Sequence, residues 1–143
     1  MGNFKIREIF LVDDDPIVRM VAIKILKSID FNHTVSSFEN GQLALDAIKS
    51  RLSEGYIFGE DEPILLLLDI NMPILDAWGF LDEFSELPPA VRNNFLIAII
   101  TSSIDTNDKI RAFSYADVVD YITKPLSAKH LSDFLTKHSL YQD

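Results

Sequence analysis

The sequence predicts an α/β fold, in which five parallel strands form one sheet and helices cover both of its faces. Short apolar runs alternate with amphipathic stretches along the chain, which is typical of repeated strand–helix units. Two of the runs, Ile64–Leu68 and Leu96–Ile100, are apolar at every position, as expected for strands that are buried on both sides. Parallel neighbours need crossover connections, so the intervening amphipathic stretches are interpreted as right-handed crossover helices.

The first half of the chain supplies two strands and two helices. Ile9–Val12 is a short apolar run that predicts the first strand. A helix is predicted from Pro16 to about Ile29, because apolar residues recur there at the spacing of one helix face: Val18, Val21, Ile25 and Ile29. His33–Phe38 is a second strand candidate, ended by Asn40-Gly41. The second helix is indicated by Leu45, Ile48 and Leu52.

The second half supplies three strands and three helices. Ile64–Leu68 is bounded by Pro63 and Asp69, and it is too short for a helix of ordinary length. The two later strands are Leu96–Ile100 and Val118–Ile122. The helices are marked, in order, by Phe80, Phe84 and Leu87 before Pro88-Pro89; by Ile110 and Phe113; and by Leu131, Phe134, Leu135 and His138.

Length and composition restrict the classes of function. The chain has 143 residues, which suits one domain; we expect a single domain over 1–143 with a core from about 7 to 138 and no output domain after it. A net charge of −9 disfavours direct binding to nucleic acid, which depends on Lys and Arg. There is no cysteine, no signal-peptide pattern and no apolar run long enough to span a membrane, so we expect a cytoplasmic protein without membrane attachment.

Side chains that can carry chemistry follow four of the five predicted strands. In a parallel sheet of this type, ligands bind outside the carboxyl ends of the strands, so these residues are expected along one edge. The second strand adds little, since it ends in Ser37, Phe38 and Glu39. The residues that follow the other four are Asp13, Asp14 and Asp15; Asp69, Ile70 and Asn71; Thr101, Ser102 and Ser103; and Thr123, Lys124 and Pro125.

Several carboxylates at one sheet edge indicate a site for a hard cation. Two carboxylates about 5 Å apart repel by about 3 kcal/mol at an effective dielectric near 20. Mg²⁺ would remove that repulsion, because it prefers carboxylate and carbonyl oxygens. A phosphoryl group could then lie between the metal and Lys124 with Thr101, and Asp69 could accept it as an aspartyl phosphate. Asp15 precedes Pro16, so we expect it to be a helix N-cap instead of a ligand.

Four segments in this order and spacing resemble the receiver domain of bacterial response regulators: FLVDDDP, LLLLDINMPILDAWGFL, IAIITSS and DYITKPL. The resemblance covers about Arg7 to His138 and implies a flavodoxin-like fold. It implies Mg²⁺ as cofactor, with Asp13, Asp14, Asp69 and the backbone carbonyl of Asn71 as ligands. It also implies that Asp69 is the phosphoacceptor, that Lys124 and Thr101 contact the phosphoryl group, that Pro125 follows a cis peptide bond, and that Thr101 and Tyr121 are switch residues.

The resemblance also implies partners. A phosphohistidine on a sensor histidine kinase or a histidine phosphotransfer protein would donate the phosphoryl group. Phosphorylation would then remodel the surface formed by the fourth helix, the fifth strand and the fifth helix, and a downstream protein would bind there. The chain would be a signalling module that catalyses its own phosphoryl transfer and dephosphorylation, not a conventional enzyme.

Two departures and two alternatives stay open at this point. The family usually has glycine where this chain has Ala77, which would cost on the order of 1 kcal/mol if that residue needed positive φ. The segment Gly55–Glu62 is longer than the usual connection. A docking module that works without phosphorylation is one alternative. A Mg²⁺-dependent phosphohydrolase is the other, although such enzymes need an acid two residues after the nucleophile, where this chain has Asn71. We assign no role to Trp78 or to the three histidines, His33, His130 and His138.

Overall fold

A five-stranded parallel sheet forms the centre of the computed structural model, which describes residues 3–55 and 62–142. The strand order is β3-β2-β4-β5-β6. The bounds are β2 Glu8–Val12, β3 Thr34–Phe38, β4 Ile64–Leu68, β5 Phe95–Thr101 and β6 Val118–Thr123. All four neighbouring pairs are parallel, which confirms the predicted sheet and the flavodoxin-like strand order.

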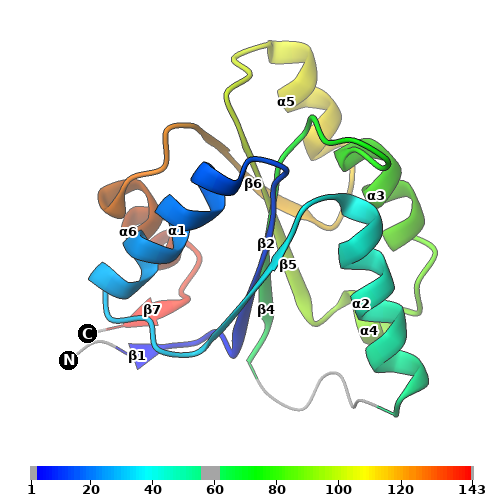
Figure 1. Ribbon diagram of the computed structural model, residues 1–143, viewed down its shortest axis with the longest axis horizontal. Coiled ribbons are helices and arrows are strands. Elements are labelled where there is room, and N and C mark those ends of the chain that lie inside the picture. The colour runs from blue at the N-terminus through cyan, green and yellow to red at the C-terminus, as the bar shows by residue number, and fades with distance from the viewer. Residues whose placement is uncertain (1–2, 56–61, 143) are drawn as a thin grey trace.

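The helices cover both faces of this sheet (Figure 1). Their bounds are α1 Pro16–Ser28, α2 Gly41–Ser53, α3 Ala77–Phe84, α4 Pro89–Arg92, α5 Thr106–Phe113 and α6 Ala128–Lys137. The apolar faces of α1 and α6 pack with Ile9 and Leu11 of β2 in one cluster. Those of α2 and α3 pack with Phe10 and Val12 in the other, since alternate strand residues point to opposite faces.

Side-chain caps fix where five of the six helices begin. In each, an oxygen of the preceding residue accepts a hydrogen bond from a backbone N–H of the first turn, a group that has no partner within the helix. The caps of α1, α2, α3, α5 and α6 are Asp15, Asn40, Asp76, Asp105 and Ser127. These residues stop each connecting loop at a defined position, and in α1 and α5 the cap lies within a few residues of the carboxyl edge of the sheet.

The structure adds elements that the sequence patterns did not indicate. Asn3–Phe4 (β1) pairs with Tyr141–Gln142 (β7) as an antiparallel ribbon beside the two termini, at the opposite end of the sheet from the carboxyl edge (Figure 1). Phe4, Ile6 and Leu140 are buried, so packed residues occur on both sides of the range 7–138. The helix α4 follows Pro88, where the patterns indicated only the end of α3.

Ala77 does not have the positive φ that would make alanine costly at this position. Ala77 is the first residue of α3 and is fully buried, and Asp76 caps the helix through a hydrogen bond from the N–H of Gly79. The left-handed residue of this loop is instead Ile74, with φ 70. The backbone strain in this loop is therefore at Ile74, an exposed β-branched residue three positions before Ala77. Of the longer connection Gly55–Glu62, residues 56–61 lie outside the described part of the chain.

Candidate functional site

The register of the sheet brings the predicted site residues to one edge. Val12 of β2 lies opposite Leu68 of β4, so the residues that follow them, Asp13 and Asp69, are neighbours. The N–H of Asp69 donates to the carbonyl of Val12 over 2.9 Å. On the other side, the N–H of Lys124 donates to the carbonyl of Thr101 over 2.7 Å. Strand pairing alone therefore fixes the backbone positions of Asp13, Asp69, Thr101 and Lys124.

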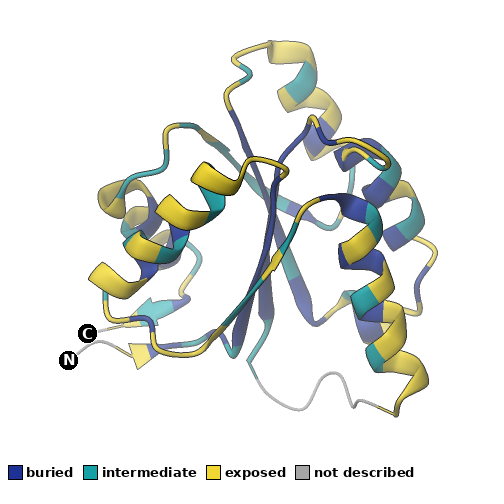
Figure 2. Cartoon of the chain, viewed as in Figure 1, coloured by how far each residue is buried: buried dark blue, intermediate teal, exposed yellow. Residues whose placement is uncertain are grey.

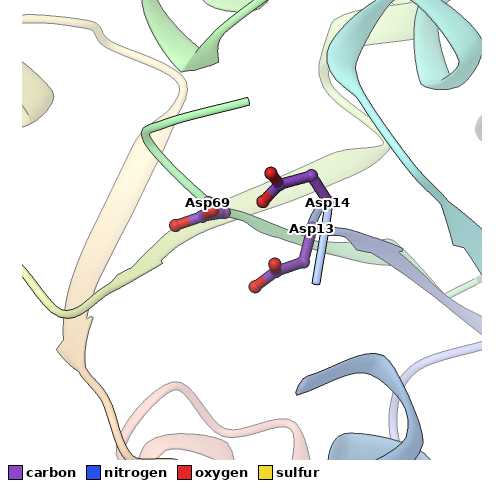
Figure 3. Close-up of side chains that lie close together, drawn as sticks. All are labelled: Asp13, Asp14 and Asp69. Atoms are coloured by element: carbon purple, nitrogen blue, oxygen red, sulfur yellow. The ribbon is translucent and has the colours of Figure 1, made fainter. Parts of the chain in front are cut away.

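Three carboxylates gather at this edge (Figure 3). One oxygen each from Asp13, Asp14 and Asp69 lies within 4.8 Å of the other two, and Asp13 and Asp69 are buried whereas Asp14 is exposed. This oxygen set fits Mg²⁺, which is held by few carboxylates and keeps several waters. Asn71, the predicted carbonyl ligand, is exposed two residues after Asp69, and its coordination stays a prediction.

Asp13 offers a buried oxygen to this cluster. Its Oδ1 accepts a hydrogen bond from the N–H of Asp15 over 2.9 Å. Its Oδ2 lies 2.8 Å from the Lys124 Nζ as an ion pair, yet among the described residues no donor reaches this atom with hydrogen-bond geometry. A buried carboxylate oxygen that is incompletely satisfied is the type of group that a cation stabilises, so the donor set fits a metal.

Lys124 supplies the positive charge of the site. Its ammonium is also 3.4 Å from the Asp69 Oδ1. Burial lowers the pKa of Lys124, but the adjacent Asp13 carboxylate, together with Asp69, outweighs this effect and raises the pKa above its ordinary value. Lys124 therefore stays protonated and can neutralise an additional anionic group at Asp69.

The Asp69 carboxyl has a raised pKa. Burial raises its pKa from 3.8 to about 6, the negative charge of Asp13 adds to the increase, and Lys124 opposes it. The ionised side chain is thus held in an unfavourable state that a cation would relieve. Such a carboxylate, next to two acids that fit a cation and to a lysine, has surroundings that suit a nucleophile for phosphoryl transfer.

Thr101 and Tyr121 are linked to one another through Ser103. Thr101 is buried at the end of β5, and its Oγ1 accepts a hydrogen bond from the N–H of Ser103 over 3.2 Å. The Tyr121 hydroxyl donates to the carbonyl of Ser103 over 3.1 Å. Burial raises the pKa of Tyr121, so its hydroxyl remains a donor at neutral pH. The two predicted switch residues therefore contact the same loop residue.

The comparisons with known proteins agree with this geometry. The family model for the response regulator receiver domain matches residues 9–136. The chain belongs to the response regulator receiver family. A two component response regulator from Cytophaga hutchinsonii has a solved structure that is similar to this receiver, with 26% identity, a TM-score of 0.78, and coverage of 92% of this chain and 96% of that chain.

Two curated relatives of this receiver are larger proteins. The protein-glutamate methylesterase/protein-glutamine glutaminase 1 of Paramagnetospirillum magneticum is 27% identical over 87% of this chain and 29% of its own length. The sensor histidine kinase CheAY of Helicobacter pylori is 29% identical over 87% of this chain and 14% of its own length. The chain therefore spans less than a third of these two relatives, and their activities are not assigned to it.

Two predicted structural residues occupy the expected positions. Asp15 caps α1 through a hydrogen bond from the N–H of Ile17 over 2.9 Å, and it is not among the three clustered carboxylates. The Lys124-Pro125 peptide bond is cis. The run of three aspartates in this receiver thus separates into two residues of the carboxylate cluster and one helix cap.

Sequence reasoning missed some contacts that organise the site. Arg19 on α1 donates from Nη1 to the carbonyl of Asp13 over 2.6 Å, and no motif distinguishes this arginine from other surface arginines. Asp108, in the first turn of α5, accepts a hydrogen bond from Ser103 over 2.7 Å. An acidic residue in a first helical turn suits the helix dipole in any case, so its sequence position did not identify the contact.

Within the described residues, no helix is long and apolar enough to cross a membrane.

Proposed function

We propose that this receiver accepts a phosphoryl group on Asp69 from a phosphohistidine donor and then changes a protein-binding surface. The observation that carries the proposal is the arrangement around Asp69: two further carboxylates within 4.8 Å and the Lys124 ammonium at 3.4 Å. The donor would be a sensor histidine kinase or a histidine phosphotransfer protein, since receiver domains pair with such proteins. A cytoplasmic location is part of the same proposal.

In the transfer step, an Asp69 carboxylate oxygen attacks phosphorus and the P–N bond to the donor imidazole breaks. The imidazole keeps the bonding electron pair and takes up a proton, and the product is an acyl phosphate on Asp69. Mg²⁺, held by Asp13, Asp14 and Asp69, would supply positive charge for the phosphoryl oxygens. Lys124 would contact a phosphoryl oxygen from the opposite side, and Thr101 would donate a hydrogen bond to another.

The proposed output surface is formed by α5, β6 and α6. Only Ala112 among the eight residues of α5 is buried, and Figure 2 shows this helix exposed along most of its length. Ile110 and Phe113 are exposed there at 64% and 46%. These exposed apolar side chains lie on a helix that packs against β6, the strand of Tyr121, and they support a protein contact at this surface.

Acetyl phosphate with Mg²⁺ tests the proposal without a kinase. We expect one phosphoryl group per wild-type chain, stable in acid and labile in base, and none on Asp69→Asn. Asp14→Asn should abolish labelling, whereas the matched variant Asp15→Asn should be labelled like the wild type. A wild type that stays unlabelled and does not bind beryllofluoride would favour the docking module, and sustained turnover of a phosphomonoester would favour the phosphohydrolase.

A further inference from the structure

One residue, Ser103, connects the loop after β5 to three other parts of the receiver, and it uses all of its polar groups to do so. Its N–H donates to Thr101 Oγ1 over 3.2 Å, and its carbonyl accepts from the Tyr121 hydroxyl over 3.1 Å. Its Oγ donates to Asp108 Oδ2 over 2.7 Å and accepts from the N–H of Asp105 over 3.2 Å. The conformation of this loop therefore depends on whether Ser103 keeps these partners.

The bond to Asp108 is the short, charge-assisted member of this set. A hydroxyl that donates to a carboxylate makes a stronger hydrogen bond than one between neutral groups. Asp108 belongs to α5, a helix that buries only Ala112 and so gains little from apolar packing. We therefore expect this hydrogen bond to supply much of the interaction energy that holds the N-terminal end of α5 against the loop.

The Thr101 hydroxyl is part of the same arrangement. Its oxygen is buried and accepts from Ser103, and among the described residues no hydrogen bond joins the Thr101 side chain to Asp69 or Lys124. If Asp69 carries a phosphoryl group, Thr101 must turn toward it. If Thr101 keeps its bond from Ser103 during this movement, residues 101–103 would shift together, and the Ser103–Asp108 bond would lengthen or break.

We propose that Asp108 is a positioning residue that latches the loop and α5 in the unphosphorylated conformation. This inference rests on the proposed function, because it assigns a regulatory role at the same site. Asp108 touches neither Asp69 nor the metal ligands in any described contact, so it acts through Ser103. Breaking the latch removes an opposing contact, and it therefore favours the phosphorylated conformation.

Beryllofluoride binding in the presence of Mg²⁺ measures this bias. The ligand mimics the phosphoryl group and is not hydrolysed, so an effect of residue 103 on dephosphorylation does not enter. We expect Asp108→Ala and Ser103→Ala each to lower the Kd about tenfold, equivalent to about 1.4 kcal/mol. The double variant should lower the Kd no further than Ser103→Ala alone, because both changes remove the Ser103–Asp108 bond and only Ser103→Ala also removes the bond from the Asp105 N–H. Asp46→Asn, an exposed carboxylate on α2, is the charge control and should leave the Kd unchanged.

Three results would overturn the proposal: an unchanged Kd in Asp108→Ala or Ser103→Ala, a raised Kd in either, or effects that multiply in the double variant. Multiplying effects would mean that Asp108 acts independently of Ser103, through its interaction with the dipole of α5. Should Asp108→Ala fail to fold by circular dichroism, Ser103→Ala tests the same bond from its other end, since its backbone contacts with Thr101 and Tyr121 remain possible.

Amide hydrogen exchange in the free protein separates this inference from the proposed function. In Asp108→Ala we expect the N–H groups of Ser103 and Asp105 to exchange about tenfold faster than in the wild type, and unchanged rates would show that Asp108 does not hold the loop. A wild type that fails to bind beryllofluoride would refute the proposed function and the switching role together, while the exchange rates would still decide whether the latch exists.

Discussion

Replacing Asp69 by asparagine should stabilise the metal-free protein. The pKa of Asp69 is raised from 3.8 to about 6, mainly by burial and then by the charge of Asp13. At about 1.4 kcal/mol per pKa unit, the ionised carboxylate lowers the unfolding free energy by about 2–3 kcal/mol above pH 6. Asparagine keeps the shape and removes the charge, so we expect Asp69→Asn to gain about 2 kcal/mol, or about 4–8 °C in Tm.

The pH dependence follows from the direction of the shift. Between about pH 4 and pH 6 the folded wild type binds more protons at Asp69 than the unfolded chain does, so its stability falls as pH rises through that window. Below pH 4 the advantage of Asp69→Asn should disappear, because Asp69 is then protonated in both states. Mg²⁺ should reduce the advantage at pH 7.5, because the cation stabilises the wild-type carboxylate.

Urea unfolding at a series of pH values, with EDTA or with excess Mg²⁺, measures these differences. Asp133→Asn is the matched control, because its carboxylate is exposed and forms a surface pair with Lys129. The reasoning would be refuted if Asp69→Asn were no more stable than the wild type in EDTA at pH 7.5. A stability difference that stayed constant from pH 4 to pH 7.5 would equally contradict it.

Three further changes test the surrounding structure by the same unfolding measurement. Arg51→Met removes the arginine that forms two hydrogen bonds of 2.8 Å with buried Glu8, and it should lower the free energy of unfolding by about 3 kcal/mol. Adding Glu8→Gln to this variant should restore part of the lost stability. No recovery would contradict the explanation that an unpaired buried charge causes the loss. Asp15→Ala removes the α1 cap and should lower the free energy of unfolding by about 1 kcal/mol, without changing the affinity for Mg²⁺ by more than about twofold. A large loss of affinity would show that Asp15 is a metal ligand. Ile74→Asn should gain about 0.5–1 kcal/mol, because asparagine tolerates the φ of 70 better; a loss would show that Ile74 is not strained.

Most of the edge could be predicted from local sequence because it depends on where strands stop. The run of apolar residues at Ile64–Leu68 indicated a buried parallel strand, and a parallel sheet brings all carboxyl ends to the same side. This rule placed Asp13, Asp69 and Lys124 near one another without any contact being known. The order Asp15-Pro16 was enough to separate a helix cap from the metal pair, because both preferences are local.

Some of the contacts that the sequence did not indicate join residues that are far apart along the chain or that lie in very short elements. Glu8 and Arg51 are 43 positions apart, and neither belongs to a pattern that links them. The strands β1 and β7 have two residues each, too few for a period to be detected. Their pairing depends on the packed positions of Phe4 and Tyr141, which only the folded chain brings together.

By itself, the sequence determined the α/β class, the strand order along the chain, and the residue types at the carboxyl edge, because hydrophobic period and capping preference act over a few residues. The tertiary structure decided how those side chains are charged and held. Burial raises the pKa of Asp69 to about 6, Lys124 lies between two carboxylates, and Ser103 ties Thr101 to Asp108. Desolvation and hydrogen-bond geometry depend on all surrounding atoms, and those surroundings exist only after the strands have paired.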